Sequence, residues 1–391
     1  MRDTLAAARV DATLFGGNAM RRSVFFSAAA ILVVSGTAVS AAPHTTLFVP
    51  QQYATIQGAI NAARAGDTVV VGPGTYPEQL SIDKSLRLIG AGARATTVRA
   101  PSVLTPSALG RNFLVDVHGG AQVTIAGITV RGPGPNACGR GSLNAGVKVT
   151  GNATLDFSGS RVLDIVDTPA SSCRGTAGAI VVGDFVAAQV GHATIHDVTV
   201  NHYQDNGIAV FGHGSDATVT DNLIDAALKP GEAVISVGVQ IGDGAFARVR
   251  NNVIGGNECN TPDIGCGADP MNNVQSSAFS AGTGDPPAPR TEFAHNIVIQ
   301  NDVGIYLFFV DDIFDVHDNV LINNRYFGIA IQDSSSTVSH DVILGGDVGV
   351  GVIADFIDSV GTLEHETILG TTGAATRTLQ CCGVTATILR D

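Results

Sequence analysis

Residues able to do chemistry recur at similar places in short, repeated segments of this sequence. One such position holds imidazole, carboxylate and amide side chains: Asp221, Asn251, His295, Asp318, His340 and His365. Imidazoles and carboxylates at a regular spacing could gather a divalent metal ion. A hydrogen-bonded corner that faces water is the more common role for such residues, so we assign no metal site to this column.

A second set of candidate residues follows from alternation in the segment that begins at Gly304. If Ile305 and Leu307 point inward, Tyr306 and Phe308 point outward. The same parity places further residues outside in related segments: Lys148, Thr150, Ile180, Val182, Ala209, Phe211, Gln240, Ala330 and Gln332. A surface this apolar is expected either to be covered or to bind a ligand.

Aromatic rings suit stacking on sugars, and polar side chains beside them can supply hydrogen bonds. We therefore predict a substrate-binding face and assign to it Phe211, Gln240, Asp302, Tyr306, Phe308, Arg325 and Gln332. The segment from Asn257 to Arg290 is expected to be a long inserted loop. It could fold over this face or leave it open. No catalytic residue is assigned.

Short strands must hold these residues in place. Gly146, Gly178, Gly207, Gly238, Gly304 and Gly328 each open an alternating aliphatic run, and further short apolar segments lie between the runs. Repeated β-branched runs with Gly and Asn at their ends predict a solenoid of stacked strands. No helical pattern separates them, which argues against alternating strands and helices. The predicted fold class is all-β, a parallel β-helix.

Another column supports coil stacking at about 4.8 Å. It holds Asn222, Asn252, Asn296, Asn319, Asp341 and Glu366. Stacked amides can hydrogen-bond from one coil to the next, so we interpret this column as a structural ladder.

The two ends of the solenoid need protection from end-to-end growth. The spacing of Ile56, Ala59, Ile60 and Ala63 predicts a capping helix over residues 53–66. The last segment, which contains Cys381 and Cys382, is expected to close the other end.

The first 41 residues are typical of a secretory signal. Met20, a possible true start, is followed by two arginines, an apolar run over 24–34 and small residues. We therefore expect a β-helix domain over residues 42–391, secreted or periplasmic, with no membrane span.

Composition limits the partners. The net charge of −13 argues against nucleic acid, because binding phosphates requires clustered Lys and Arg. The six cysteines fit an oxidising compartment. Pairing by neighbourhood would join Cys138 to Cys173, Cys259 to Cys266 and Cys381 to Cys382, although other pairings remain possible.

The stretch from Tyr53 to Gly92 resembles the opening of right-handed parallel β-helix proteins of the pectin-lyase-like superfamily. The Gly-opened coils with Asn corners resemble that superfamily's repeats over most of residues 45–391. The resemblance implies a right-handed, single-stranded helix outside the cytoplasm and a polysaccharide ligand. It says little about catalysis.

Three enzyme groups of this superfamily match only in part. Gly74, Tyr76 and Glu78 resemble a pectin methylesterase opening, but the catalytic motifs have no counterpart and the chain has no Trp. The triplet at 212–214 resembles polygalacturonases, which also need paired aspartates about a coil earlier; only Asp205, seven residues before Gly212, is near, which favours a turn.

Pectate lyases use acidic calcium ligands and a basic residue. Such a site could be assembled from Asp302, Asp311, Asp312, Asp315 and Arg325. A solvated acidic edge is the more common explanation, so we assign no cofactor and leave calcium possible.

We thus predict a monomeric secreted β-helix that binds or acts on a uronate-type polysaccharide. The alternative is a non-catalytic structural or adhesion protein of the cell envelope. Whether the protein is an enzyme is left open; if it is, the resemblance implies a lyase, hydrolase or esterase.

Overall fold

The computed structural model describes residues 44–135, 141–167, 178–184, 189–229, 235–259, 265–267, 269, 271, 273, 275–282, 291–310 and 314–391. The expected signal segment, Cys138, Cys173, Asp311 and Asp312 lie outside the described residues. The unit from His44 to Asp391 contains helix α1 (Ile56–Ala62) and strands β1 to β35.

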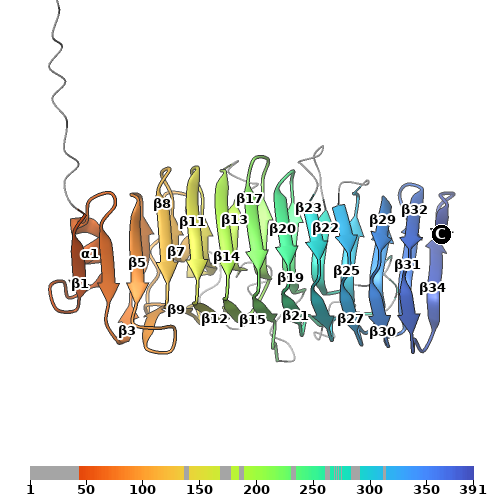
Figure 1. Ribbon diagram of the computed structural model, residues 1–391, viewed down its shortest axis with the longest axis horizontal. Coiled ribbons are helices and arrows are strands. Elements are labelled where there is room, and N and C mark those ends of the chain that lie inside the picture. Colours follow the sequence, from red (N-terminus) through yellow and green to blue (C-terminus); the bar gives the residue numbers. More distant parts are fainter. Residues whose placement is uncertain are drawn as a thin grey trace, which may run out of the picture. The chain divides into compact units, whose positions relative to one another are not determined.

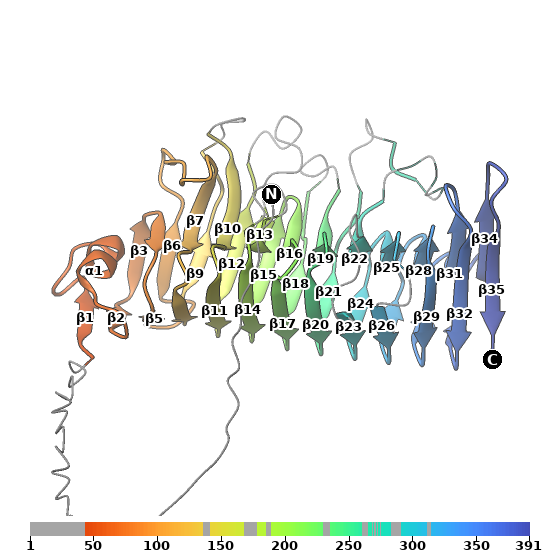
Figure 2. The same ribbon diagram turned by 90° about the horizontal axis from the view of Figure 1, so that it is seen from above.

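The strands form three parallel sheets, to which each complete coil gives one strand apiece (Figures 1 and 2). Sheet 1 contains β1 (Thr46–Val49), β2 (Thr68–Val71), β5 (Leu86–Gly90), β8 (Gln122–Ala126), β11 (Ala153–Ser158), β14 (Gly191–His196), β17 (Asp216–Thr220), β20 (Phe246–Arg250), β23 (Thr291–Ala294), β26 (Phe314–His317), β29 (Ser335–Ser339), β32 (Ser359–Glu364) and β35 (Ala386–Arg390). Sheet 2 contains β4 (Leu80–Ile82), β7 (Asn112–Val117), β10 (Leu143–Val149), β13 (Gly178–Gly183), β16 (Asn206–Phe211), β19 (Val237–Gly242), β22 (Ser277–Gly282), β25 (Val303–Phe308), β28 (Phe327–Gln332), β31 (Val348–Ala354) and β34 (Ala374–Gln380). Sheet 3 contains β3 (Gly74–Pro77), β6 (Thr96–Arg99), β9 (Thr129–Arg131), β12 (Arg161–Ile165), β15 (Thr199–Tyr203), β18 (Leu223–Asp225), β21 (Val253–Gly255), β24 (Ile297–Ile299), β27 (Val320–Ile322), β30 (Val342–Leu344) and β33 (Thr367–Leu369).

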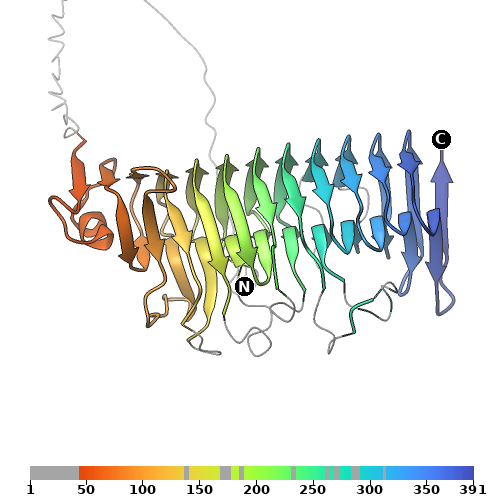
Figure 3. The same ribbon diagram turned by 90° about the horizontal axis from the view of Figure 1, so that it is seen from below.

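This topology is a right-handed parallel β-helix, which confirms the predicted fold class. The strands of each sheet follow one another along the axis of the unit in chain order (Figure 3). Alternation explains the choice of residues, because one side of every strand fills the interior. Ile305 and Leu307 are fully buried inside, while Tyr306 and Phe308 lie half-buried on the outer face, as predicted.

In strand β13 the alternation of inward and outward side chains is shifted by one residue from the prediction. Ala145 pairs with Gly178, so Ala179 rather than Gly178 occupies the position equivalent to Gly146. Ile180 and Val182 therefore point inward and are fully buried, whereas Val181 is on the outer face. A slip of one residue reverses the direction of every side chain in a strand.

The segment expected to be one long loop contains a strand. Residues 277–282 form β22, which lies between β19 and β25 in sheet 2 and completes the coil of β23 and β24. The strand lacks the opening glycine, since Ala278 occupies that position, and its serines weaken the aliphatic pattern.

The opening glycines are explained by close backbone approach. A Cβ on Gly328 would lie 2.7 Å from the carbonyl oxygen of Gly349, and one on Gly207 would lie 2.5 Å from that of Gly238. Both distances are too short for a carbon atom, so neighbouring coils pack most closely where this residue is glycine.

The predicted ladder is present at the corner between sheets 1 and 3. The side-chain amide of each asparagine donates a hydrogen bond to the side-chain oxygen of the next one. The distances are 2.9 Å from Asn222 to Asn252, 3.0 Å from Asn252 to Asn296 and 3.1 Å from Asn296 to Asn319. Asn319 then donates to Asp341 at 2.9 Å.

The preceding column, from Asp221 to His365, has a left-handed backbone, with φ between 56° and 59°. Asn, Asp and His tolerate this conformation better than other residues with a side chain, which explains the composition of the column. A second amide ladder joins Asn257, Asn301 and Asn324, each step at 2.9 Å, and was not predicted.

Helix α1 is shorter than the predicted cap. It buries Ile56 and Ile60, and Thr55 caps its start. The Glu78 carboxylate accepts the N–H groups of Ile56 and Gln57, both at 2.9 Å, so Glu78 fastens the helix to the first coils.

The opposite end differs from the expectation. Strands β34 and β35 extend sheets 2 and 1 instead of folding across the end. Disulfides join Cys259 to Cys266 and Cys381 to Cys382, as neighbourhood predicted. Among the described residues, no helix is long and apolar enough to cross a membrane.

Candidate functional site

Most of the predicted binding residues lie on the outer face of sheet 2. In one row, Gln240 is followed by Ser280 and then Tyr306. In the next row, Phe308 lies beside Gln332, and the Tyr306 hydroxyl is 2.6 Å from Gln332 Oε1. The structure thus brings Tyr306, Phe308 and Gln332 together, although Gln332 is buried and its oxygen already accepts this hydrogen bond.

The aromatic surface is larger than the sequence indicated. The rings of Tyr306 and Phe308 stack at 5.9 Å, Phe308 contacts Phe309 at 4.4 Å, and Phe309 stacks on Phe356 at 6.0 Å. Phe309 and Phe356 are 38% and 66% exposed. We call these four residues the aromatic patch. Alternation missed Phe309 and Phe356 because both follow the ends of their strands.

Asp302 is not available to a ligand. It is fully buried, and its carboxylate accepts the N–H groups of Cys259 at 2.7 Å and Ser276 at 3.1 Å. Burial raises the pKa of Asp302, which the two N–H groups oppose. The residue therefore anchors both sides of the inserted segment to the coil that follows.

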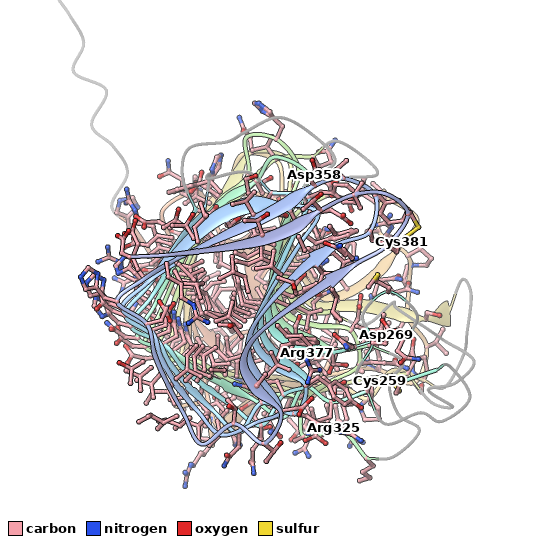
Figure 4. The ribbon with its side chains drawn as sticks, turned by 90° about the vertical axis from the view of Figure 1, so that its right-hand side faces the viewer. Cys259, Asp269, Arg325, Asp358, Arg377 and Cys381 are labelled. Atoms are coloured by element: carbon pink, nitrogen blue, oxygen red, sulfur yellow. A yellow bond between two sulfur atoms is a disulfide. The ribbon has the colours of Figure 1, made fainter. Side chains whose placement is uncertain are left out.

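Arg325, in contrast, is largely exposed. Its guanidinium lies 3.8 Å from the Asp302 carboxylate and 4.8 Å from the centre of the Tyr326 ring. In the end-on view, Arg325, Asp269 and Cys259 lie on the same side of the β-helix (Figure 4). Met271, from the inserted segment, packs against the outer cluster of Val303, Phe327, Ala330, Val348 and Ile353, and Tyr306 packs against the same cluster.

Of the lyase-like assembly considered from the sequence, the described aspartates Asp302 and Asp315 lie at different sheets. Asp315 is on β26 of sheet 1, whereas Asp302 precedes β25 of sheet 2. The triplet Gly212, His213 and Gly214 forms a turn in which both glycines have a left-handed φ. Tyr76 is buried and Glu78 caps α1, so the esterase-like opening has a structural role.

Sequence patterns missed a groove at the β4 end of sheet 2. It has a volume of about 800 Å³ and is lined by residues that include Ser81, Phe113, Asp116, His118 and Thr150. We call it the Ser81 groove. The Ser81 Oγ and His118 Nε2 lie 2.9 Å apart. The residues come from different coils, so no local pattern connects them.

Asp116 lies between Ser81 and Lys148 in the outer row of sheet 2. Its Oδ1 is buried, and no described residue makes a hydrogen bond to it. Burial raises the pKa of Asp116, while His118 and Lys148 act in the opposite direction. A carboxyl group that holds its proton more tightly than usual can act as a general acid.

A smaller pocket of about 330 Å³ shares Phe113 with the groove and reaches Phe211. At its floor, Lys148 donates to the Gly183 carbonyl at 2.7 Å and to Asp184 at 3.0 Å. Arg111 approaches the same Asp184 oxygen at 2.7 Å. Burial lowers the pKa of Lys148, and Asp184 opposes this shift.

The far wall of this pocket includes Asp205, which was considered from the sequence. Burial raises the pKa of Asp205 to about 6, against the hydrogen bond with Asn206. Groove and pocket together therefore offer the carboxyls of Asp116 and Asp205 and the imidazole of His118 beside the Ser81 hydroxyl. They also offer the partly exposed guanidinium of Arg111. This set can support acid–base chemistry and polar binding.

Comparison with known proteins shows fold likeness only. No protein-family model matches the chain, and no curated protein matches it in sequence. A Yersinia enterocolitica family 28 exopolygalacturonase has 10% identity, covering 90% of this chain and 76% of its own, with a TM-score of 0.47. The pectin methylesterase PemA from Erwinia chrysanthemi has 13% identity, 68% and 81% coverage, and a TM-score of 0.40.

The periplasmic alginate epimerase AlgG has 11% identity, 83% and 77% coverage, and a TM-score of 0.39. Likenesses at this level carry no argument. The three parallel sheets themselves define the chain as a right-handed parallel β-helix, as the sequence predicted.

Proposed function

We propose that this protein, exported from the cytoplasm, binds and acts on a polysaccharide along the outer face of sheet 2. The Ser81 groove carries this proposal, because it combines a large cavity with adjacent hydroxyl, imidazole and carboxyl groups. From β7 to β25 the face spans six strand spacings, roughly 29 Å. A face of this length suits an extended polymer better than a small molecule.

Each part of the face has a proposed task. His118 and Asp116 exchange protons with the substrate in the groove, and Ser81 positions it by a hydrogen bond. The aromatic patch, Phe211 and Gln240 contact sugar rings further along. Arg111 and Arg325 favour a uronate-type chain, because a guanidinium can bind a carboxylate through two hydrogen bonds.

The test is a screen of the purified protein on polygalacturonate, alginate and neutral polymers, with and without calcium. Reducing ends and unsaturated products report turnover, and affinity electrophoresis reports binding. Asp116→Asn and His118→Gln are expected to lower turnover by about 10²- to 10⁴-fold, since each removes an acid–base group. Tyr306→Ala with Phe308→Ala is expected to weaken binding roughly tenfold.

His213→Gln is the matched control for His118→Gln. It changes an exposed histidine in a turn at the edge of sheet 2, outside the groove, and is expected to retain turnover. Unchanged turnover in Asp116→Asn and His118→Gln would reject the groove as the reacting site. Absence of both binding and turnover on every polymer would favour the alternative, a non-catalytic structural or adhesion protein.

A further inference from the structure

A cluster of imidazole and carboxylate groups lies away from the outer face of sheet 2. It is at the corner between sheets 1 and 3, where strand β26 ends. We propose that His295, His317 and Asp318 bind one divalent transition-metal ion of the Zn²⁺ class. This site is independent of the proposed polysaccharide face.

The three side chains already converge. One ligand atom from each lies within 4.8 Å of the other two. His317 Nδ1 is 2.7 Å from an Asp318 oxygen, and the rings of His295 and His317 meet edge to face at 5.7 Å. Ligand atoms around tetrahedral zinc are roughly 3.4 Å apart, given bonds of about 2.1 Å. Since His295 and Asp318 are exposed, small side-chain rotations can close the difference.

Neighbouring charges favour a cation at this corner. Glu292 Oε1 lies 3.4 Å from His317 Nε2 and also pairs with Arg250. Asp315 is in register with Glu292 on the adjacent strand. Two imidazoles thus lie among carboxylates from two coils. Glu292, on the Nε2 side of the ring, is placed to orient His317.

Backbone geometry does not account for this cluster. His295 and Asp318 occupy left-handed corner positions, which Asp221 and Asn251 fill equally well elsewhere. His317, however, lies within strand β26, and its partners in register are Ala294 and Ser339. Its side chain pairs with the carboxylates of Glu292 and Asp318. The third ligand therefore comes from outside the corner column.

The ligand types select the class of metal. Two imidazole nitrogens and a carboxylate suit Zn²⁺, Co²⁺, Ni²⁺ or Cu²⁺. Calcium and magnesium prefer sites made wholly of oxygen. The nearby pair His340 and His365 has stacked rings 4.9 Å apart, but no third ligand joins it among the described residues. That pair provides an internal control.

The test is calorimetric titration of the purified full chain with ZnCl₂ after treatment with EDTA. We expect one strong site, not displaced by excess Ca²⁺, with visible absorption bands when Co²⁺ replaces Zn²⁺. His295→Asn and Asp318→Asn retain a residue that tolerates the left-handed corner, and His317→Gln keeps a polar side chain in the strand. Each is expected to weaken Zn²⁺ binding at least tenfold while leaving thermal unfolding in EDTA unchanged.

His340→Asn is the matched control, with the same substitution in the same column. It is expected to bind Zn²⁺ within about twofold of the unaltered protein. The proposal is overturned if the unaltered protein shows no Zn²⁺ binding below millimolar concentration, or if Ca²⁺ competes equally. It is also overturned if His340→Asn weakens binding as much as His295→Asn.

Discussion

Two carboxyl groups at one end of the amide ladder are hard to deprotonate, because they are buried. Asp341 and Glu366 stand where the other coils have asparagine. Burial raises the pKa of Asp341 to about 7 and that of Glu366 to about 8, and the charge of Asp341 adds to the second shift. One oxygen of each carboxyl is buried, and no described residue makes a hydrogen bond to it.

This arrangement predicts a stability that falls as the pH rises. Both folded-state pKa values lie above the unfolded values, so the folded chain binds more protons in between. The extra stability is complete below about pH 4 and disappears as the pH passes through 7 and 8. Asp341→Asn should remove roughly half of this loss and raise stability at pH 8 by about 1–3 kcal/mol.

Urea denaturation followed by circular dichroism at pH 5 and pH 8 measures this effect. Asp221→Asn is the control, because Asp221 is exposed at its corner and its substitution should leave the pH dependence unchanged. Equal losses of stability between the two pH values in Asp341→Asn and the unaltered protein would contradict the prediction.

At the scale of elements, the ladder joins coils through hydrogen bonds that have no alternative partner. The side-chain oxygen of Asn252 accepts two hydrogen bonds from Asn222, one from its backbone N–H at 3.0 Å and one from its side-chain amide at 2.9 Å. Its own amide donates to the carbonyls of Val219 and Arg250, both at 2.9 Å. Because Asn252 is buried, water cannot replace these contacts.

Asn252→Ala should therefore lower the free energy of unfolding by more than an ordinary surface substitution does. It leaves several buried groups unpaired, each at about 1–3 kcal/mol, so we expect a loss of about 3 kcal/mol or more. Chemical denaturation provides the measurement. Asn251→Asp, one residue earlier at an exposed corner, should change stability by less than about 0.5 kcal/mol. Similar losses in the two variants would show that the ladder adds little.

At the scale of the whole unit from His44 to Asp391, each coil contacts mainly the coils before and after it. The stability of such a stack is close to the sum of the stabilities of the coils and of the interfaces between adjacent coils. A substitution that disrupts one coil should therefore affect mainly that coil and its neighbours. A Cβ on Gly349 would meet the Ala375 carbonyl oxygen at 2.5 Å. Gly349→Val thus forces adjacent coils apart.

Hydrogen exchange read by mass spectrometry tests this locality. In Gly349→Val, exchange should become faster in β28, β31 and β34 and stay unchanged in β5, β8 and β11. Gly282→Ala is the control, since its added carbon would come no closer than 3.5 Å to a neighbour. Faster exchange across all these strands would mean that the unit opens as one block.

The parts of this protein that repeat could be predicted from sequence. Alternation with Ile305 and Leu307 predicts that Tyr306 and Phe308 point outward. The repeated local corner of each coil predicts the asparagine ladder. Proximity in the chain predicts the pairing of Cys259 with Cys266 and of Cys381 with Cys382, as the structure shows.

The amino-acid sequence by itself therefore determined the stacked parallel strands, their buried aliphatic face and the amide ladder, since each depends on a pattern within one coil. Only the tertiary structure decided the register of β13, the presence of β22 and the meeting of Ser81 with His118. These features depend on which residue of one coil stands beside which residue of the next. Turns of unequal length set that register, and a shift of one residue exchanges inside for outside.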